Sequence, residues 1–166
     1  DSPANPRLLV KPGTISMKVS PELKPIRPVI LGAVVRGVNI DEDAIKRLMD
    51  HQEKLHFALG RGRKRASIGV HDLNKVSPPF RVEAVDRNHS FIPLAMEEPM
   101  TIQEILEQHP KGIDYAHLLN GMENVPVILD SNNDVLSFPP IINGEHTTVT
   151  TDTRNLFVDV TGLDLR

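Results

Sequence analysis

Cysteine is absent from the 166 residues of this chain, and so is tryptophan. A disulfide framework, a thiolate zinc site and a cysteine nucleophile are therefore excluded, and an intracellular setting fits better than a secreted one. With one tyrosine and five phenylalanines, the chain also lacks the aromatic platform on which proteins stack single-stranded bases. These absences remove several common catalytic and nucleic-acid-binding schemes.

Long apolar runs are missing as well. Runs without a polar side chain, such as Val29–Val35 and Val125–Leu129, are five to seven residues long, whereas a helix that crosses a bilayer needs roughly 20. No charged segment followed by an apolar stretch opens the sequence, so a secretory signal is not expected. We therefore predict a cytoplasmic protein without a membrane span.

The length and the 39% apolar content suit one domain with a sizeable core. The first residue is Asp1 and not methionine, which favours a piece excised from a longer protein over a processed one. We expect a single domain over residues 1–166, with an irregular, partly strand-forming N-terminal part over residues 1–28.

Charge is distributed unevenly along the chain. Residues 1–83 hold 15 basic and 9 acidic side chains, a balance of +6, while residues 84–166 hold 4 and 13, a balance of −9. This argues against non-specific binding to long duplexes but allows a local phosphate contact. The basic run Arg61, Arg63, Lys64 and Arg65 could grip a phosphate or simply form a solvated face.

The hydrophobic pattern predicts an α+β domain, with mixed or antiparallel sheets and a few packed helices. One helix should begin at a capping box formed by Asn39 and Glu42 and end at Gly60, and a shorter one should begin at a capping box formed by Thr101 and Glu104. A further one or two helical turns are expected over Asp114–Leu119. The predicted strands are Arg7–Val10, Ile15–Val19, Val29–Val35, Ser67–Val70, Phe80–Val85, Phe91–Leu94, Val125–Leu129, Val135–Phe138 and Asn155–Thr161, with a turn over Asp130–Asp134.

Gln52 is out of place on the first helix. It lies four residues after Leu48 and three before Leu55, so its amide occupies the apolar stripe and should point inward. A buried amide without a partner costs roughly 1–3 kcal/mol. Either the backbone or a substrate could pair it.

Two further places carry polar groups among apolar residues. Asn143 before Gly144 suits a turn that needs a positive φ, and its amide could also stabilise an oxyanion at an ester under attack. Asp159 and Thr161, two residues apart, share one face of the last strand, where polar residues are usually solvated.

Familiar catalytic motifs are missing. The seven histidines have no zinc-binding spacing, so no metal site is expected. The chain has no GxSxG nucleophile elbow, phosphate-binding loop or dinucleotide-binding turn. His146 could act as a base, but beside Glu145 it is more typical of a surface histidine.

Several ordered motifs together resemble one family, the amino-acid editing domain of the archaeal and eukaryotic type of phenylalanyl-tRNA synthetase β subunit. The resemblance covers roughly residues 29–162. Its motifs are Gln52–Leu55 with Gly60–Lys64, IGVHDL at Ile68–Leu73, HPKG at His109–Gly112, DYAHLL at Asp114–Leu119, VLSFPPIINGE at Val135–Glu145 and RNLFVDVTG at Arg154–Gly162.

The resemblance implies hydrolysis of tyrosine mistakenly esterified to phenylalanine tRNA. The glutamine, arginine and asparagine that the family uses near the scissile ester correspond to Gln52, Arg63 and Asn143. Because no Ser, Cys or His nucleophile is evident, we expect water to attack the ester, and the three catalytic side chains should converge on one cleft.

The resemblance also assigns the side-chain pocket and the tRNA contacts. The family residues that recognise the tyrosine hydroxyl correspond to Ser137, Asp159 and Thr161, with an aliphatic residue that here is Ile128 in place of leucine. A tRNA contact is implied for Leu94, and Arg61 and Lys64 are expected to bind tRNA as well. The basic residue that the family pattern carries near Thr148 is missing at that place.

The class II aminoacylation motifs are absent from this chain, so the domain should need no cofactor, and ATP and Mg²⁺ would act elsewhere in the full synthetase. The implied partners are the 3′ end of phenylalanine tRNA, the mischarged tyrosine and the synthetase α subunit. Two alternatives stay open: a non-catalytic module that binds RNA or the partner subunit, and a stand-alone deacylase acting in trans.

Overall fold

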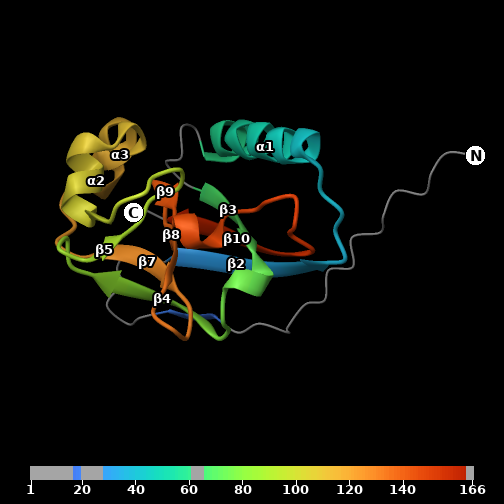
Figure 1. The fold of residues 1–166 in the computed structure, drawn as a ribbon. Helices are drawn as coiled ribbons and strands as arrows, with labels where there is room; N and C mark the ends of the chain where they lie inside the picture. The colour runs from blue at the N-terminus through green and yellow to red at the C-terminus, as the bar shows by residue number, and fades with distance from the viewer. Residues whose placement is uncertain (1–16, 20–27, 61–65, 164–166) are drawn as a thin grey trace, which may run out of the picture.

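The computed structural model describes residues 17–19, 28–60 and 66–163, which form three sheets and the helices packed on them (Figure 1). The predicted strand Arg7–Val10 lies outside the described residues. The helices are α1 (Glu42–Gly60), α2 (Ile102–Gln108) and α3 (Pro110–Tyr115), with short 3₁₀ turns η2 (Leu73–Lys75), η3 (Ala116–Leu119) and η4 (Glu145–Thr147). The strands are β1 (Met17–Val19), β2 (Pro28–Arg36), β3 (Ala66–Asp72), β4 (Phe80–Val85), β5 (Ser90–Phe91), β6 (Met100–Thr101), β7 (Val125–Leu129), β8 (Val135–Phe138), β9 (Ile142–Asn143) and β10 (Asn155–Leu163).

Two sheets make up the body of the domain. The larger has the order β1-β4-β7-β8-β9 and the smaller the order β2-β10-β3, while β5 and β6 form a separate ribbon. All pairs are antiparallel except β1 with β4, which is parallel. The predicted α+β class with mixed sheets is therefore confirmed.

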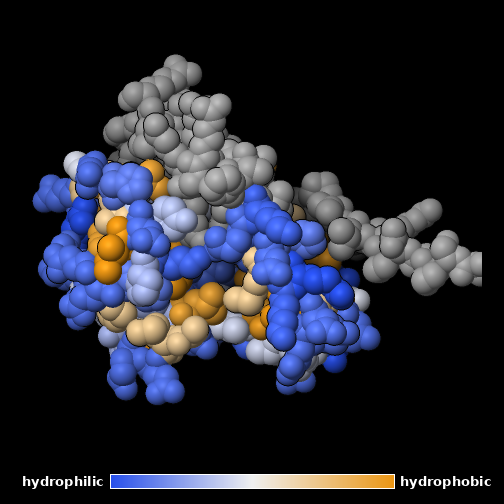
Figure 2. All heavy atoms as spheres, turned by 90° about the horizontal axis from the view of Figure 1, so that it is seen from above, coloured by the Kyte–Doolittle hydropathy of each residue, from blue (hydrophilic) through white to orange (hydrophobic). Residues whose placement is uncertain are grey.

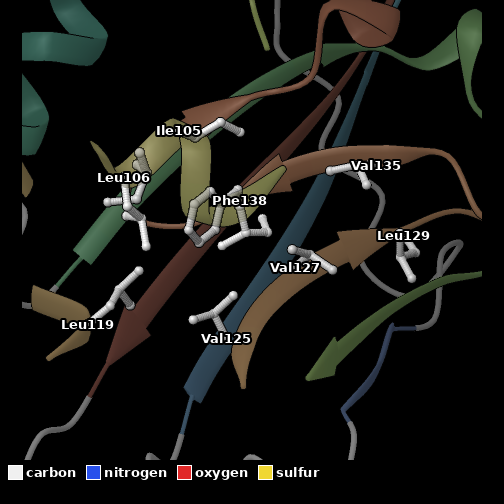
Figure 3. Packing of buried hydrophobic residues seen from close by; sticks show 10 residues of the cluster. Ile105, Leu106, Leu119, Val125, Val127, Leu129, Val135 and Phe138 are labelled. Atoms are coloured by element: carbon white, nitrogen blue, oxygen red, sulfur yellow. The ribbon is translucent and has the colours of Figure 1, made fainter. Parts of the chain in front are cut away.

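The core has two layers, separated by the larger sheet. Every residue of its central strand β7 is buried, because one face of the strand meets the smaller sheet and the other meets α2 and η3. The layer under the helices includes the side chains labelled in Figure 3. The layer between the sheets is centred on Phe80 and Phe157, whose rings lie 4.5 Å apart.

The two predicted helix starts had different outcomes. At α1 the capping residue is Asp41, whose Oδ1 accepts the Ala44 N–H at 2.7 Å, so the expected capping box at Asn39 is wrong by two residues. At α2 the predicted box is confirmed. The Thr101 hydroxyl accepts the Glu104 N–H at 3.1 Å, and the Glu104 carboxylate accepts the Thr101 N–H at 3.0 Å, which lowers the pKa of Glu104.

Thr101→Ala should lower the free energy of unfolding by about 1 kcal/mol, the usual cost of removing such a cap. The substitution frees the Glu104 N–H without opening the core. Urea unfolding measures the change, with Thr151→Ala in an exposed turn as the matched control. Equal stability of the two variants would contradict the prediction.

Other predicted elements changed in length or position. The strand predicted over Phe91–Leu94 ends at Phe91 in the structure, and only Pro93 continues as an isolated bridge to Gly144. The turns predicted over Asp114–Leu119 are present as the end of α3 and η3. The predicted turn after β7 is confirmed, because Asp130 Oδ1 accepts the N–H groups of Asn132 and Asp134. Among the described helices, none is both long and apolar enough to cross a membrane.

Candidate functional site

A cavity of about 700 Å³ opens between α1, β3, the start of α3 and the segment from β8 to η4. Seen from above, hydrophobic residues are exposed in a hollow between hydrophilic sides (Figure 2). The residues that line it come from separate parts of the chain and include Gln52, Ser67, Gly69, His109, Lys111, Ser137 and Asn143.

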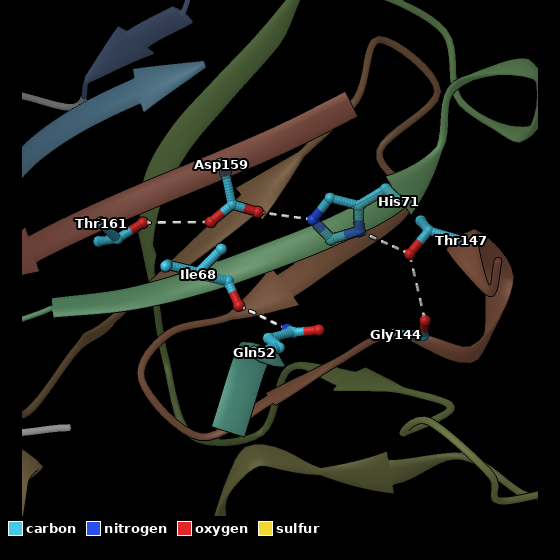
Figure 4. Close-up of polar contacts among 7 residues, drawn as sticks. All are labelled: Gln52, Ile68, His71, Gly144, Thr147, Asp159 and Thr161. Carbon is cyan, nitrogen blue, oxygen red and sulfur yellow. Dashed lines mark hydrogen bonds and ion pairs between the residues drawn. The ribbon is translucent and has the colours of Figure 1, made fainter. Parts of the chain in front are cut away.

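Gln52 reaches the cavity from α1, which lies beside β3, the edge strand of the smaller sheet. Its Nε2 donates to the backbone carbonyl of Ile68 at 2.5 Å, so the backbone is the partner of the amide nitrogen. This contact fixes the amide plane, and Oε1 has no hydrogen bond to a described residue. Gln52 therefore offers an oriented acceptor at the cavity wall (Figure 4).

Asn143 is the last residue of β9 and does not occupy the positive-φ turn that the sequence suggested. Neither Asn143 nor Gly144 has a positive φ, since Gly144 has φ −78°. The glycine is required for another reason: a Cβ there would collide with the Val135 carbonyl. The Asn143 backbone carbonyl accepts the Leu94 N–H at 2.9 Å, and its half-buried side-chain amide has no partner among the described residues.

A β-bulge decides where Ser137 points. Ile128 pairs with Ser137 while the next residue, Leu129, pairs with Val135, so β8 holds one extra residue, Leu136, between the pairs. Because directly paired residues share a face, Ser137 lies on the same side as Ile128, which packs in the layer between the sheets. The bulge thus turns the buried Ser137 away from α2 and into the cavity.

Asp159 and Thr161 face the same interlayer space from β10, and both are 1% exposed. The interpretation of these residues as a solvated strand face is therefore wrong. Neither lines the cavity directly, nor does Ile128. Ser67 and Gly69, which pair with Thr161 and Asp159 across the strands, do line the cavity.

His71 is the site residue that the sequence analysis missed. Its Nε2 lies 2.5 Å from Asp159 Oδ2 and its Nδ1 lies 2.7 Å from Thr147 Oγ1 (Figure 4). The imidazole is fully buried and stacks on Phe157. Strand alternation from Asp159, once the pairing of β3 with β10 is known, would have found it.

The structure describes only some of the residues that are predicted to contact tRNA. Leu94 lies at the cavity and is half-buried, whereas Arg61, Arg63 and Lys64 lie outside the described residues. So Gln52 and Asn143 share one cavity as expected, and the place of the third catalytic candidate stays a prediction.

A basic group does lie at Thr148, although the sequence shows none nearby. Lys75 Nζ, from η2, donates to the Thr148 carbonyl at 2.9 Å. The ammonium group beside the Thr148 backbone therefore comes from a residue 73 positions earlier in the chain.

Two charged groups face each other across the cavity rim. Lys111 Nζ, from α3, lies 2.5 Å from Glu53 Oε1 on α1, and both side chains are well exposed. Beneath them His109 accepts the Lys111 N–H at its Nδ1. Burial lowers the pKa of His109, and the positive charge of Lys111 lowers it further. The imidazole is therefore a neutral polar group in the wall at neutral pH.

Asp130, Asp134 and His146 are the one group of three potential metal ligands that the described residues bring together. None of them lines the cavity. The Asp130 carboxylate already accepts three backbone N–H groups, from Ser77, Asn132 and Asp134. His146 is half-exposed at the surface, 3.6 Å from Asp134, as expected for a surface histidine.

Comparison with known proteins gives consistent matches. A model of the B3/4 domain family matches residues 24–165. The phenylalanine–tRNA ligase β subunit of Methanosarcina acetivorans is 55% identical over 158 residues, which cover 95% of this chain and 29% of that protein. The β subunit from Methanocaldococcus jannaschii is 53% identical over 139 residues, 83% of this chain and 25% of that protein.

One solved structure matches closely. An N-terminal fragment of the phenylalanyl-tRNA synthetase β subunit from Pyrococcus horikoshii superposes with a TM-score of 0.88 at 43% identity, covering 96% of this chain and 46% of the fragment. The chain spans less than a third of the length of the two curated relatives above.

Proposed function

Because this chain belongs to the B3/4 domain family, we propose that it acts within a phenylalanine–tRNA ligase β subunit and hydrolyses tyrosine esterified by mistake to phenylalanine tRNA. The observation that carries the proposal is the single cavity into which Gln52, Asn143 and Ser137 project from three separate segments. The similarity to ligase β subunits over most of the chain supports the same reading.

The physical need for such an activity follows from the substrates. A pocket that accepts phenylalanine cannot firmly exclude an analogue with one more hydroxyl, so a second site must destroy the wrong product. That second site has to spare phenylalanine. A buried polar group that only a phenol can satisfy does this, because phenylalanine leaves it unpaired.

In the proposed mechanism, water attacks the ester carbonyl. Gln52 Oε1 accepts a hydrogen bond from the water, a role that suits the amide because its nitrogen is already bound to Ile68. The Asn143 amide, with Arg63, donates to the oxyanion that develops on the carbonyl oxygen. Collapse of the oxyanion breaks the bond between the acyl carbon and the ribose oxygen, and the ribose oxygen leaves as a hydroxyl with the proton that the attacking water gives up. Proximity and charge stabilisation supply the rate, since no nucleophilic side chain takes part.

Side-chain recognition is assigned to Ser137, Asp159 and Thr161, with Ile128 as the apolar neighbour. The proposed partners are the 3′ end of phenylalanine tRNA, contacted by Leu94, Arg61 and Lys64, and the synthetase α subunit. A cytoplasmic location follows from a role in aminoacylation.

Deacylation of tyrosyl- and phenylalanyl-tRNA, measured side by side for the intact synthetase and for this chain, tests the proposal. We expect rapid release of tyrosine and slow release of phenylalanine. Hydrolysis of neither substrate by the intact enzyme would leave a non-catalytic binding module. Activity of this chain alone would exclude a non-catalytic binding module, and a gene that encodes only this chain would favour a deacylase acting in trans.

Chelation should not abolish the reaction. The proposed oxyanion donors are amide and guanidinium groups, and the cavity lining holds no cluster of metal ligands among the described residues. The tyrosyl-tRNA is prepared beforehand, so that Mg²⁺-dependent aminoacylation is not part of the assay. Its rate of hydrolysis should not change when the enzyme is treated with EDTA at constant ionic strength. Loss of activity that zinc alone restores would contradict this prediction.

A further inference from the structure

We infer that His71 is a positioning residue that sets the substrate specificity of the cavity by fixing the carboxylate of Asp159. The inference rests on the proposed function and extends it to a residue that has not been assigned a role. Three observations carry it: a complete hydrogen-bond chain through the imidazole, a glycine that the chain requires, and the place where the chain ends.

The first observation concerns protons. An ionised carboxylate only accepts hydrogen bonds, so His71 Nε2 carries the hydrogen that bridges the 2.5 Å to Asp159 Oδ2. In the neutral imidazole, Nδ1 then accepts from the Thr147 hydroxyl at 2.7 Å. Asp159 Oδ2 is therefore committed, and the carboxylate is held so that Oδ1 is the oxygen left for a substrate.

Oδ1 has only a weak partner in the chain. The Thr161 hydroxyl lies 3.4 Å from it, at the long end of hydrogen-bond distances, compared with the 2.5 Å contact on Oδ2. A phenol O–H could replace this weak contact, whereas a phenyl ring would leave a buried carboxylate oxygen poorly satisfied. The geometry thus gives Asp159 one locked oxygen and one oxygen that only a weak contact holds.

The second observation is the absence of a side chain at Gly69. A Cβ there would collide with Asp159 Oδ2 and with His71 Nε2. Gly69 also lines the cavity, so the bridging pair lies directly behind the cavity wall at the one lining position of β3 without a side chain. The backbone of β3 is shaped around this hydrogen bond.

The third observation is where the chain ends. The backbone N–H of Thr147 donates to the carbonyl of Gly144, the residue after Asn143, at 3.5 Å, and the Thr147 hydroxyl is thereby free to donate to His71. The hydrogen bonds therefore connect the corner that carries the ester-binding amide to the strand that carries the phenol-binding carboxylate (Figure 4). His71 lies between the two. Its loss should therefore change the preference for tyrosyl-tRNA by more than a loss of stability alone would.

The test compares deacylation of tyrosyl- and phenylalanyl-tRNA by intact synthetases carrying His71→Leu or His71→Gln. Leucine removes the donor, so the preference for tyrosyl-tRNA should fall at least about tenfold, mainly through faster hydrolysis of phenylalanyl-tRNA. Glutamine keeps an N–H donor of similar reach and should restore part of the preference. Rescue by glutamine is a result that a purely space-filling role would not produce.

Thr153→Val is the matched control. Thr153, in the loop before β10, donates to the buried Asp72 of β3 at 2.8 Å, so the substitution breaks an equally buried hydrogen bond that does not involve the cavity lining. It should lower stability while leaving the ratio of the two rates unchanged. Thr147→Val removes only the outer partner of His71 and should lower the preference severalfold, which keeps the inference testable if His71→Leu does not fold.

The outcomes separate the two proposals. A wild-type synthetase that deacylates neither substrate overturns the proposed function, and the inference with it. A wild-type enzyme that prefers tyrosyl-tRNA, with His71→Leu or Thr147→Val keeping that preference intact, overturns only the inference and makes His71 a structural residue of the core.

Discussion

Asn143→Ala is expected to slow hydrolysis of tyrosyl- and phenylalanyl-tRNA by one common factor, about 10²–10³, the usual cost of losing one oxyanion donor. The factor is common because the amide serves the ester, which both substrates share, and not the side chain. The free energy of unfolding should change little, because the Asn143 amide has no hydrogen-bond partner among the described residues. Single-turnover deacylation of each charged tRNA measures the two rates.

Asn132→Ala provides the matched control, because it makes the same substitution in an exposed turn outside the cavity. Its rates should equal those of the wild type. If Asn143→Ala slows tyrosyl-tRNA and leaves the residual phenylalanyl-tRNA rate unchanged, Asn143 recognises the amino-acid side chain and the mechanism is wrong at that position.

Asp159→Ala should produce a gain of the wrong activity. With the carboxylate gone, phenylalanine no longer leaves a buried charge poorly satisfied, so phenylalanyl-tRNA becomes a substrate while tyrosyl-tRNA keeps appreciable hydrolysis. The discrimination between the two should fall by about 10²-fold or more, given that sites built for a hydroxyl discriminate by 10⁴–10⁵. Rates on both charged tRNAs, read together, give this ratio.

Stability has to be followed in the same experiment, because the buried His71 loses its acceptor when Asp159 is removed. Thr161→Val is the milder companion variant, since it removes a hydroxyl 3.4 Å from Asp159 and leaves the pair with His71 intact. It should shift the ratio in the same direction. If Asp159→Ala only slows the hydrolysis of tyrosyl-tRNA and leaves the rate on phenylalanyl-tRNA unchanged, Asp159 is a structural residue of the strand.

The strands were predictable from the sequence where turn residues bound them on both sides. Val125–Leu129 and Val135–Phe138 were predicted with the bounds that the structure has, because Asp, Ser and Asn separate two apolar runs. The start of α1 moved from Asn39 to Asp41 because both residue types can cap, and only tertiary packing decides between them.

The candidate site was less predictable. Alternation along a strand tells which residues share a face but not whether another sheet covers that face, so the burial of Asp159 and Thr161 could not be read from the sequence. His71 is a lone histidine in an apolar strand until the pairing of β3 with β10 is known. Gln52 was correctly placed on the inner stripe, while the choice of the Ile68 carbonyl as its partner depends on β3 being an edge strand.

The extra residue in β8 has a consequence for how the cavity can change in evolution. Deleting Leu136 would leave Val135 opposite Leu129 and Ser137 opposite Ile128, so the pairing would become regular and Ser137 would keep the face that it shares with Ile128. The deletion would also remove a fully buried leucine from the layer between the sheets. A change of length in β8 is therefore a way to loosen the packing behind the cavity while keeping the Ser137 hydroxyl at its wall.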